Sequence, residues 1–243
     1  MSIVGLVPLR AGGKRVGLID GLDKERATMG NHSLMAWTIA SAKDSGIFDE
    51  IVAITASYDH ADVAKSCGIK YAIRPNYTAL DNSPDIEWVS WFFSVVEKKY
   101  DAFAILRVTS PFRSAATIRA AWDEFRTTPG AHSLRAVRRV SEHPGKMWVI
   151  RHGYALPLLP AGDPFEPWHS QPTQNLPDVY IQTAGLEMAW TKVVQETRTI
   201  AGSVVLPWVL EEPEALDINT RDDWDEAIAL VEAGLVKLPT SIK

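Results

Sequence analysis

The sequence predicts an α/β fold built on a mostly parallel sheet, because short apolar runs alternate with amphipathic segments along most of the chain. Four apolar runs are expected to be strands: residues 3–8, 51–55, 71–73 and 103–108. The segments between and after them carry apolar residues three and four positions apart, as helices do: residues 34–42, 60–67, 86–96 and 116–125. Strands that alternate with helices of this length form βαβ units with right-handed crossovers. Such sheets bind ligands beyond the carboxyl ends of their strands, so we expect the chemistry to follow residues 8, 55 and 108.

Length and composition set the class of protein. The chain has 243 residues, enough for one α/β domain with an appendage, and its 25 basic against 30 acidic side chains leave a net charge of −5. That charge excludes binding to nucleic acid by bulk positive charge. The single cysteine, Cys67, excludes an intrachain disulfide and a cysteine-rich zinc site. The sequence shows no export signal and no apolar run near the ~20 residues of a membrane span, so we expect no membrane partner and a cytoplasmic location.

The alternation stops between about residues 143 and 177. This stretch holds seven prolines, exposed-looking aromatics such as Trp148 and Phe165, and no helical period. It is too long for a simple connection, so we expect an excursion such as a lid or an oligomer arm. Strands are expected again at 179–189 and 203–207. A last helix at 220–233 is opened by a capping pattern from Thr220 to Asp223.

The loop after the first strand is the first candidate site. Gly12 and Gly13 allow successive backbone N–H groups to point at one place, and Arg10, Lys14 and Arg15 add cations. Such a loop suits a polyphosphate, although a surface loop with incidental basic residues has the same composition. It matches neither a Walker loop nor a GxGxxG fingerprint.

A second candidate is the turn that follows residue 108. Thr109 and Ser110 lie where a strand passes into a helix, and Ser114 is placed to cap that helix. For Thr109 and Ser110, ligand binding and plain turn chemistry are equally good interpretations. Arg113 is expected at the surface. The six histidines show no ligand spacing, which argues against a histidine-based metal site.

Five stretches, in order along the chain, resemble the acylneuraminate (CMP-sialic acid synthetase) family of cytidylyltransferases. The stretches are Arg10-Ala11-Gly12-Gly13-Lys14 with Lys24-Glu25, Phe48 to Thr55, Ile73-Arg74-Pro75 with Leu80-Asp81-Asn82-Ser83, Ile105 to Arg113, and Leu216-Asp217-Ile218-Asn219-Thr220. Several positions depart from the family pattern: Glu25 replaces an Asn, Ala56 an Asp, Arg107 a Gln and Asn219 an Asp. The resemblance implies a divergent member with a Rossmann-like, mostly parallel sheet, a nucleotidyltransferase fold, and an inserted dimerisation arm.

The resemblance also implies roles for individual residues. Arg10, Lys14 and Lys24 would be catalytic. The nucleotide CTP would be bound by Leu9, Arg10, Ala11, Gly12, Gly13, Lys14, Lys24, Arg74, Asp81, Arg107, Thr109 and Ser110. Asp217 and Asn219 would hold Mg²⁺, because that cation prefers carboxylate, amide and phosphate oxygens. Asn219 contributes no negative charge and should bind more weakly than an Asp. Without a metal, Asp217 and Asn219 would only cap or brace the last helix.

The proline-rich stretch resembles the family's dimerisation insert, which implies a core of residues 1–140 and 181–243 and an arm of residues 141–180. His143-Pro144-Gly145-Lys146 matches the family, so the acceptor would be bound by Lys146 together with Gln182, Thr183 and Glu187. The family's Gln-Pro-Arg reads Gln171-Pro172-Thr173, so a second cation is missing from the arm. Arg135, Arg138 and Arg139 could supply that charge, but an exposed basic face explains them more simply.

Taken together, the resemblance implies a homodimeric enzyme that transfers CMP from CTP to a sialic-acid-like 2-keto-3-deoxy sugar acid and releases pyrophosphate. One alternative is a nucleotidyltransferase with another acceptor, such as a sugar phosphate. A second alternative is a catalytically weakened relative that only binds a nucleotide, which the departures at Glu25, Ala56, Thr173 and Asn219 suggest.

Overall fold

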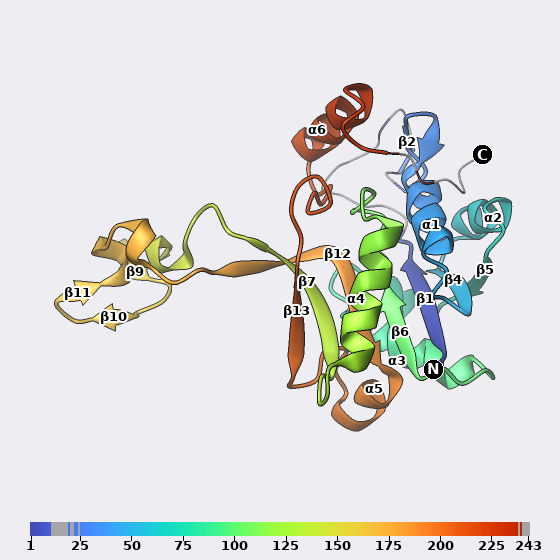
Figure 1. The fold of residues 1–243 in the computed structure, drawn as a ribbon, viewed down its shortest axis with the longest axis horizontal. Helices are drawn as coiled ribbons and strands as arrows, with labels where there is room; N and C mark the ends of the chain where they lie inside the picture. The colour runs from blue at the N-terminus through green and yellow to red at the C-terminus, as the bar shows by residue number, and fades with distance from the viewer. Residues whose placement is uncertain (11–18, 20–21, 24, 238, 240–243) are drawn as a thin grey trace.

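The structure, a computed structural model, describes residues 1–10, 19, 22, 23, 25–237 and 239 (Figure 1). Within this part of the chain, seven strands form one central sheet in the order β13-β7-β12-β6-β1-β4-β5. The strands are β1 (Ile3–Pro8), β4 (Glu50–Thr55), β5 (Lys70–Ile73), β6 (Ala102–Ile105), β7 (Ser133–Arg139), β12 (Tyr180–Trp190) and β13 (Val205–Val209). Only β12 runs antiparallel to its neighbours among these seven, so the sheet is mostly parallel, as the sequence predicts.

Helices cover both faces of the sheet. The helices are α1 (Leu34–Ser45), α2 (Tyr58–Ser66), α3 (Asp85–Val95), α4 (Ala115–Thr127), α5 (Thr191–Thr197) and α6 (Arg221–Glu232). Alternate residues of β1 face opposite layers: Ile3 and Val7 join the core under α1 and α4, whereas Val4 and Leu6 join the core under α3 and α5. The fold is therefore a three-layer α/β domain. No helix in the described residues is both long and apolar enough to span a bilayer.

Local signals in the sequence set the helix starts. The Ser33 hydroxyl accepts a hydrogen bond from the Ala36 N–H at 3.2 Å, and the Ser114 hydroxyl accepts one from the Thr117 N–H at 3.0 Å. Thr220 and Asp223 form a reciprocal capping box at the start of α6, which confirms the expected capping pattern.

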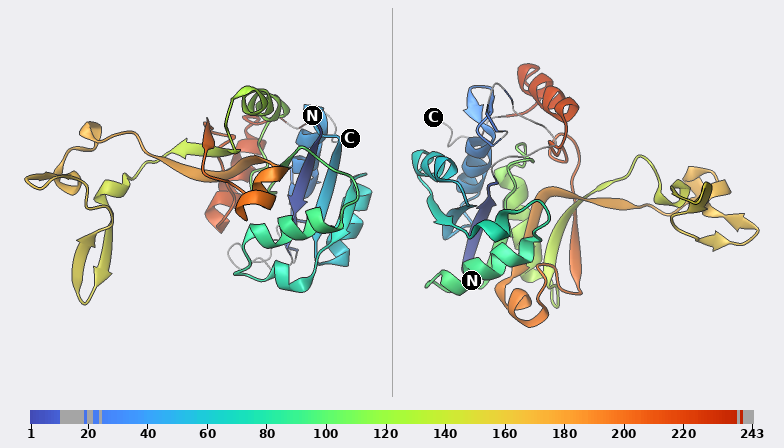
Figure 2. Two further views of the ribbon diagram at one scale, coloured as in Figure 1. Left: turned by 90° about the horizontal axis from the view of Figure 1, so that it is seen from below. Right: turned by 180° about the vertical axis from the view of Figure 1, so that it is seen from behind.

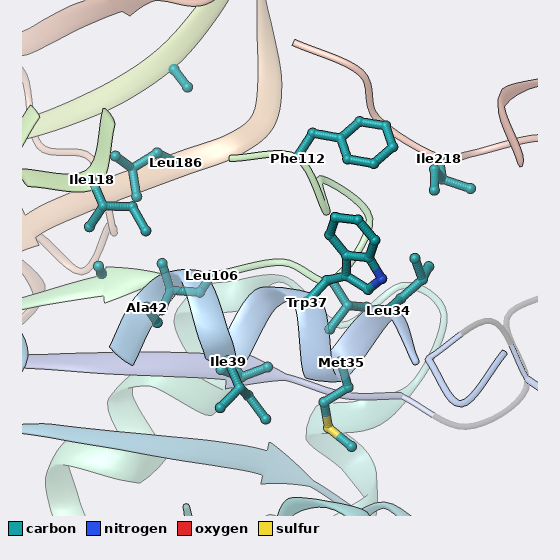
Figure 3. Close-up of a cluster of buried hydrophobic side chains, with 14 of the residues drawn as sticks. Leu34, Met35, Trp37, Ile39, Ala42, Leu106, Phe112, Ile118, Leu186 and Ile218 are labelled. Carbon is teal, nitrogen blue, oxygen red and sulfur yellow. The ribbon is translucent and has the colours of Figure 1, made fainter. Parts of the chain in front are cut away.

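The packing of Trp37 connects α1 to the turn that follows β6 (Figure 3). Its ring meets Phe112 edge-on at a centroid distance of 5.7 Å, and its Nε1 donates to the Met29 carbonyl at 2.9 Å. Ile218 belongs to the same buried cluster. The turn after β6 and the segment that carries Asp217 are thus anchored on one core.

Residues 140–179 leave the body between β7 and β12 and project well away from it (Figures 1 and 2). They form two small hairpins, β8 (Trp148–Arg151) with β9 (Tyr154–Pro157) and β10 (Gly162–Asp163) with β11 (Glu166–Pro167), joined by 3₁₀ turns. In the body of the protein, β2 (Thr28–Met29) pairs with β3 (His32–Ser33) in a short ladder, and a 3₁₀ turn spans Asn76–Ala79. On the projecting segment of residues 140–179, large apolar side chains are exposed, and the side chain of Phe165 is 95% exposed.

Candidate functional site

A cavity of about 310 Å³ lies at the carboxyl ends of β1 and β6, at the sheet edge where the sequence predicts chemistry. Its lining brings together segments that are far apart in the chain. The lining residues are Pro8, Arg10, Glu25, Arg74, Thr78, Leu80, Asp81, Ser83, Asp85, Trp88, Arg107, Val108 and Thr109. Three of them are arginines and three are acidic, so the cavity offers charged donors to an anionic ligand without a net positive charge of its own.

Arg10 lies at the mouth of this cavity. Its Nη1 donates to the Leu80 carbonyl at 3.1 Å, and its Nη2 is 3.3 Å from the Asp81 carboxylate. Both side chains are well exposed, so the pair contributes little to stability and can open to a ligand at low cost.

Arg74 lies deeper in the cavity wall. Its guanidinium donates to the carbonyls of Thr78 at 3.1 Å and Leu9 at 3.3 Å and lies over the Trp88 ring. Burial lowers the pKa of Arg74 to about 10, against the opposing effect of Asp85. The side chain is still a cation at neutral pH, and its buried Nε has no partner among the described residues.

Arg107 begins a chain of ion pairs that is partly buried at Asp85 and buried at Arg135. Its Nε donates to Glu187 Oε1 at 2.9 Å, and its Nη2 contacts both Glu187 and Asp85. Glu187 in turn pairs with Arg135, whose Nη2 donates to the Ile200 carbonyl at 2.9 Å. The prediction of an exposed basic face is therefore wrong for Arg135, which is buried. It is met in part by Arg138 and Arg139, which are exposed, although Arg139 also pairs with Asp178.

These pairings fix the charge states. Burial alone would lower the pKa of Arg107, but the carboxylates of Glu187 and Asp85 raise it above its ordinary value. Burial would raise the pKa of Asp85, yet Arg107, a hydrogen bond from Trp88 and the charge of Arg74 bring it below its ordinary value. Arg107 and Asp85 are therefore both ionised at neutral pH.

The turn after β6 is tied to the segment that carries Asp217. The Ile218 N–H donates to the Thr109 carbonyl at 2.8 Å. Ser110 is buried next to Thr109, and its hydroxyl has no partner in the described part of the chain. Ser114 caps α4 as expected.

Arg113 is not at the surface, contrary to expectation. Its side chain is 1% exposed and donates to the Gly185 carbonyl of β12. Burial lowers its pKa to about 10, and the nearby Glu214 carboxylate opposes that shift. The charge is held between β12 and the segment that leads to Asp217.

Asp217 has the features of a metal ligand. Its Oδ1 is buried without a partner in the described residues, and its Oδ2 accepts a 2.6 Å hydrogen bond from Asn219 Nδ2. The helix start is satisfied by Thr220 and Asp223, so Asp217 is not needed as a cap. An orphaned carboxylate oxygen next to an amide fits a divalent cation.

A second group of possible metal ligands was not foreseen. Ligand atoms of Asp23, Glu25 and His60 lie within 4.8 Å of one another, and all three residues are buried. His60 Nε2 is 3.1 Å from Asp23 Oδ2, which also contacts Arg26. His60 and Asp23 are 37 positions apart, so no short sequence spacing could have revealed this group.

The structure separates the residues expected to bind the acceptor. Lys146 lies on the projecting arm, with its Nζ 3.5 Å from the His169 carbonyl. On β12, Gln182 is exposed, whereas Thr183 and Glu187 are buried. The Thr183 hydroxyl accepts a hydrogen bond from the Gly185 N–H at 3.2 Å. Ala11, Gly12, Gly13, Lys14 and Lys24 lie outside the described residues.

A larger cavity, of about 720 Å³, opens at the other end of the sheet, near Met1, Lys98 and Thr191. It lies beside the start of β6 rather than its carboxyl end, away from the arginines and from Asp217. Ligands of open α/β sheets bind at the carboxyl edge, so the smaller cavity is the better candidate.

Comparison with known proteins agrees with this geometry. The chain is 26% identical over 230 residues to N-acylneuraminate cytidylyltransferase of Escherichia coli, which covers 94% of this chain but 52% of that protein. It is 28% identical over 240 residues to CMP-N,N'-diacetyllegionaminic acid synthase of Legionella pneumophila, covering 96% of this chain and 97% of that protein. No model of a known protein family matches the chain.

Solved structures show the same fold. CMP:2-keto-3-deoxy-manno-octonic acid synthetase complexed with CTP superposes with a TM-score of 0.69 at 14% identity, covering 96% of this chain and 100% of that one. The 4-diphosphocytidyl-2C-methyl-D-erythritol synthase of Anaerococcus prevotii gives 0.66 at 12% identity, covering 95% and 98%. The chain spans about half the length of its Escherichia coli relative, and it is similar over most of its own length to both of these curated enzymes, at 26% and 28% identity.

Proposed function

We propose that this protein transfers CMP from CTP to an acidic sugar of the 2-keto-3-deoxy class and releases pyrophosphate. The observation that carries the proposal is the joining of the three-arginine cavity to the Asp217 segment through the 2.8 Å bond between Ile218 and Thr109. The homologues named above act in the same chemistry, which supports this choice among nucleotidyl transfers.

Different residues bind the different parts of CTP. Arg10, together with the Gly12, Gly13, Lys14 and Lys24 that the sequence suggests, binds the triphosphate. Arg74 and Asp81 bind near the base and ribose. An acceptor hydroxyl attacks the α-phosphorus in line, a new P–O bond forms, and the bond to the β-phosphate oxygen breaks as pyrophosphate leaves. The protein mainly positions the reactants and stabilises charge on the phosphate oxygens.

Asp217 and Asn219 are the residues that would hold Mg²⁺. When bound, Mg²⁺ neutralises charge on the phosphate oxygens. The orphaned Oδ1 of Asp217 supports this role, and the neutral Asn219 makes the site weaker than one with two carboxylates.

The thiol of Cys67 has no disulfide partner, which suits a reducing, cytoplasmic setting.

We further propose that residues 141–180 are a dimerisation arm. The arm projects from the body and exposes Trp148, Ile150 and Phe165, a pattern typical of a surface covered by a partner. In a homodimer, Lys146 would reach the acceptor in the partner's cavity. Light scattering during gel filtration tests this assembly, and a monomer at micromolar concentration would contradict it.

Calorimetry with each of the four nucleoside triphosphates, followed by pyrophosphate release with sugar acids and sugar phosphates, tests the activity. We expect binding and turnover with CTP and a sugar acid. Turnover with sugar phosphates instead would favour the other acceptor class, and CTP binding without turnover would favour a binding relative. Failure to bind any triphosphate would overturn every enzymatic interpretation.

A further inference from the structure

The guanidinium of Arg107 is held along one edge only. Its Nε and Nη2 face Glu187 and Asp85, and its Nη1 has no partner among the described residues. The side chain is 29% exposed and lines the cavity. Two carboxylates therefore fix the plane of the guanidinium and leave one nitrogen, with two N–H groups, available to a ligand.

The surroundings of Arg107 favour an anion over a neutral group. Asp85 and Glu187 carry two negative charges, and Arg74, Arg107 and Arg135 carry three positive ones. Arg10 and Asp81 offset each other at the mouth of the cavity, and Glu25 lies elsewhere on its wall. The ion-pair network around Arg107 thus has one more cation than anions, although Arg135 and Glu187 lie behind the cavity wall and not in its lining. Charge-assisted hydrogen bonds are strong in such a partly desolvated place.

The arginines of β7 are already engaged by other groups, and the arm lacks a second cation. Arg135 is buried and uses its two terminal nitrogens on Glu187 and Ile200. Arg139 pairs with Asp178 on the strand that leads to the arm. On the arm itself, position 173, where a second cation was expected, is a threonine.

We propose that Arg107, which the family resemblance places among the nucleotide ligands, instead binds the carboxylate of the acceptor sugar acid, and that Asp85 and Glu187 hold it in the orientation this requires. The cation missing from the arm is supplied from within the core. The guanidinium of arginine only donates hydrogen bonds and keeps its positive charge. The group that it binds must therefore accept hydrogen bonds, and a negatively charged carboxylate does so most strongly. This inference rests on the proposed cytidylyl transfer.

The test compares two forms of one acceptor with wild type and Arg107→Gln. The acceptor is whichever of N-acetylneuraminic acid and 2-keto-3-deoxy-manno-octonic acid the wild type turns over. The second form is the same sugar with a carboxamide in place of the carboxylate. Loss of a charge-assisted hydrogen bond should raise the KM for the acid on the order of 10- to 100-fold in Arg107→Gln. The KM for the carboxamide and the dissociation constant for CTP should stay within about threefold of wild type.

Three further variants separate recognition from folding. Arg107→Lys keeps the charge but loses the fork, so it should recover part of the preference for the acid. Glu187→Gln should raise the KM for the acid while kcat changes less, because Arg107 loses one of its two supports. Arg138→Gln, an exposed arginine on β7, is the matched control and should behave as wild type.

The outcomes are distinct. An unchanged KM for the acid in Arg107→Gln, or an equal loss for acid, carboxamide and CTP, overturns the role of Arg107. A wild-type protein that releases no pyrophosphate from CTP with any sugar acid overturns the proposed function instead.

Discussion

Arg107 Nε donates a 2.9 Å hydrogen bond to Glu187 Oε1, and this contact joins the end of β6 to the middle of β12 across 80 positions of the sequence. Glu187 then pairs with Arg135 on β7, so one carboxylate connects three neighbouring strands. The network supports the inner wall of the cavity as well as the sheet. Its energetic weight can be measured separately from its role in binding.

Replacing Arg135 with Met should destabilise the protein on the order of 3 kcal/mol, because Glu187 stays buried with one cation fewer. Arg139→Met is the matched control on the same strand, since its pair with Asp178 is largely exposed and should contribute less than about 1 kcal/mol. Urea unfolding of both variants measures the difference. Equal losses would show that burial of the Glu187 pair carries no special weight.

Asp217→Ala should reduce kcat by about 100-fold or more while leaving the unfolding free energy close to wild type, because several kcal/mol of charge stabilisation would be lost. Asp222→Ala, in the exposed first turn of α6, removes the same charge five residues away and should keep nearly full turnover. Steady-state rates over a Mg²⁺ titration make the comparison. Full activity in Asp217→Ala would remove the metal assignment.

Trp37→Ala should cost about 3–5 kcal/mol, because a fully buried ring and its hydrogen bond to Met29 are both lost. Trp148→Ala on the arm is the contrasting variant. Its side chain is half exposed, so we expect the core to keep its stability and the dimer to weaken. Thermal unfolding measures the stability of the core, and light scattering measures the dimer. A large loss of core stability in Trp148→Ala would contradict a separate arm.

Asp85 should make stability depend on pH in acid. Its pKa in the folded protein lies below the ordinary value of 3.8, so the unfolded chain takes up its proton first as the pH falls. The stabilisation is complete above about pH 5 and is lost as the pH drops through 3.8 and then through the folded value. Asp85→Asn should therefore show a flatter curve of unfolding free energy between pH 5 and pH 2.5 than wild type. Parallel curves for the two proteins would contradict the ion pair with Arg107.

The features that could be predicted from the sequence are those that depend on residues close together in the chain. Ser114 and Thr220 are caps that depend on residues three positions away, and both predictions hold. Arg113 and Arg135 were placed at the surface because a charge is normally exposed, yet Gly185 and Glu187, 72 and 52 positions away, make their burial possible. The sequence does not predict the strand β7 for the same reason, since its three arginines mask a segment whose first four residues are all buried.

The candidate site shows the same division. The turns after residues 8 and 108 were predicted to meet at one sheet edge, and the structure brings Arg10 and Thr109 to one cavity there. The fold of the arm could not be derived, because the strands of its two hairpins are mostly exposed and show no buried face with a period of two. The engagement of Arg107 with Asp85 and Glu187 needed three segments to be placed together.

The most direct test of the cytidylyl transfer proposed here is mass spectrometry of the products formed from CTP, Mg²⁺ and a 2-keto-3-deoxy sugar acid. We expect a CMP-sugar adduct that forms in equal amount with pyrophosphate and is absent when CTP is replaced by ATP. CTP left intact with every sugar acid, or CMP transferred only to a sugar phosphate, would contradict it.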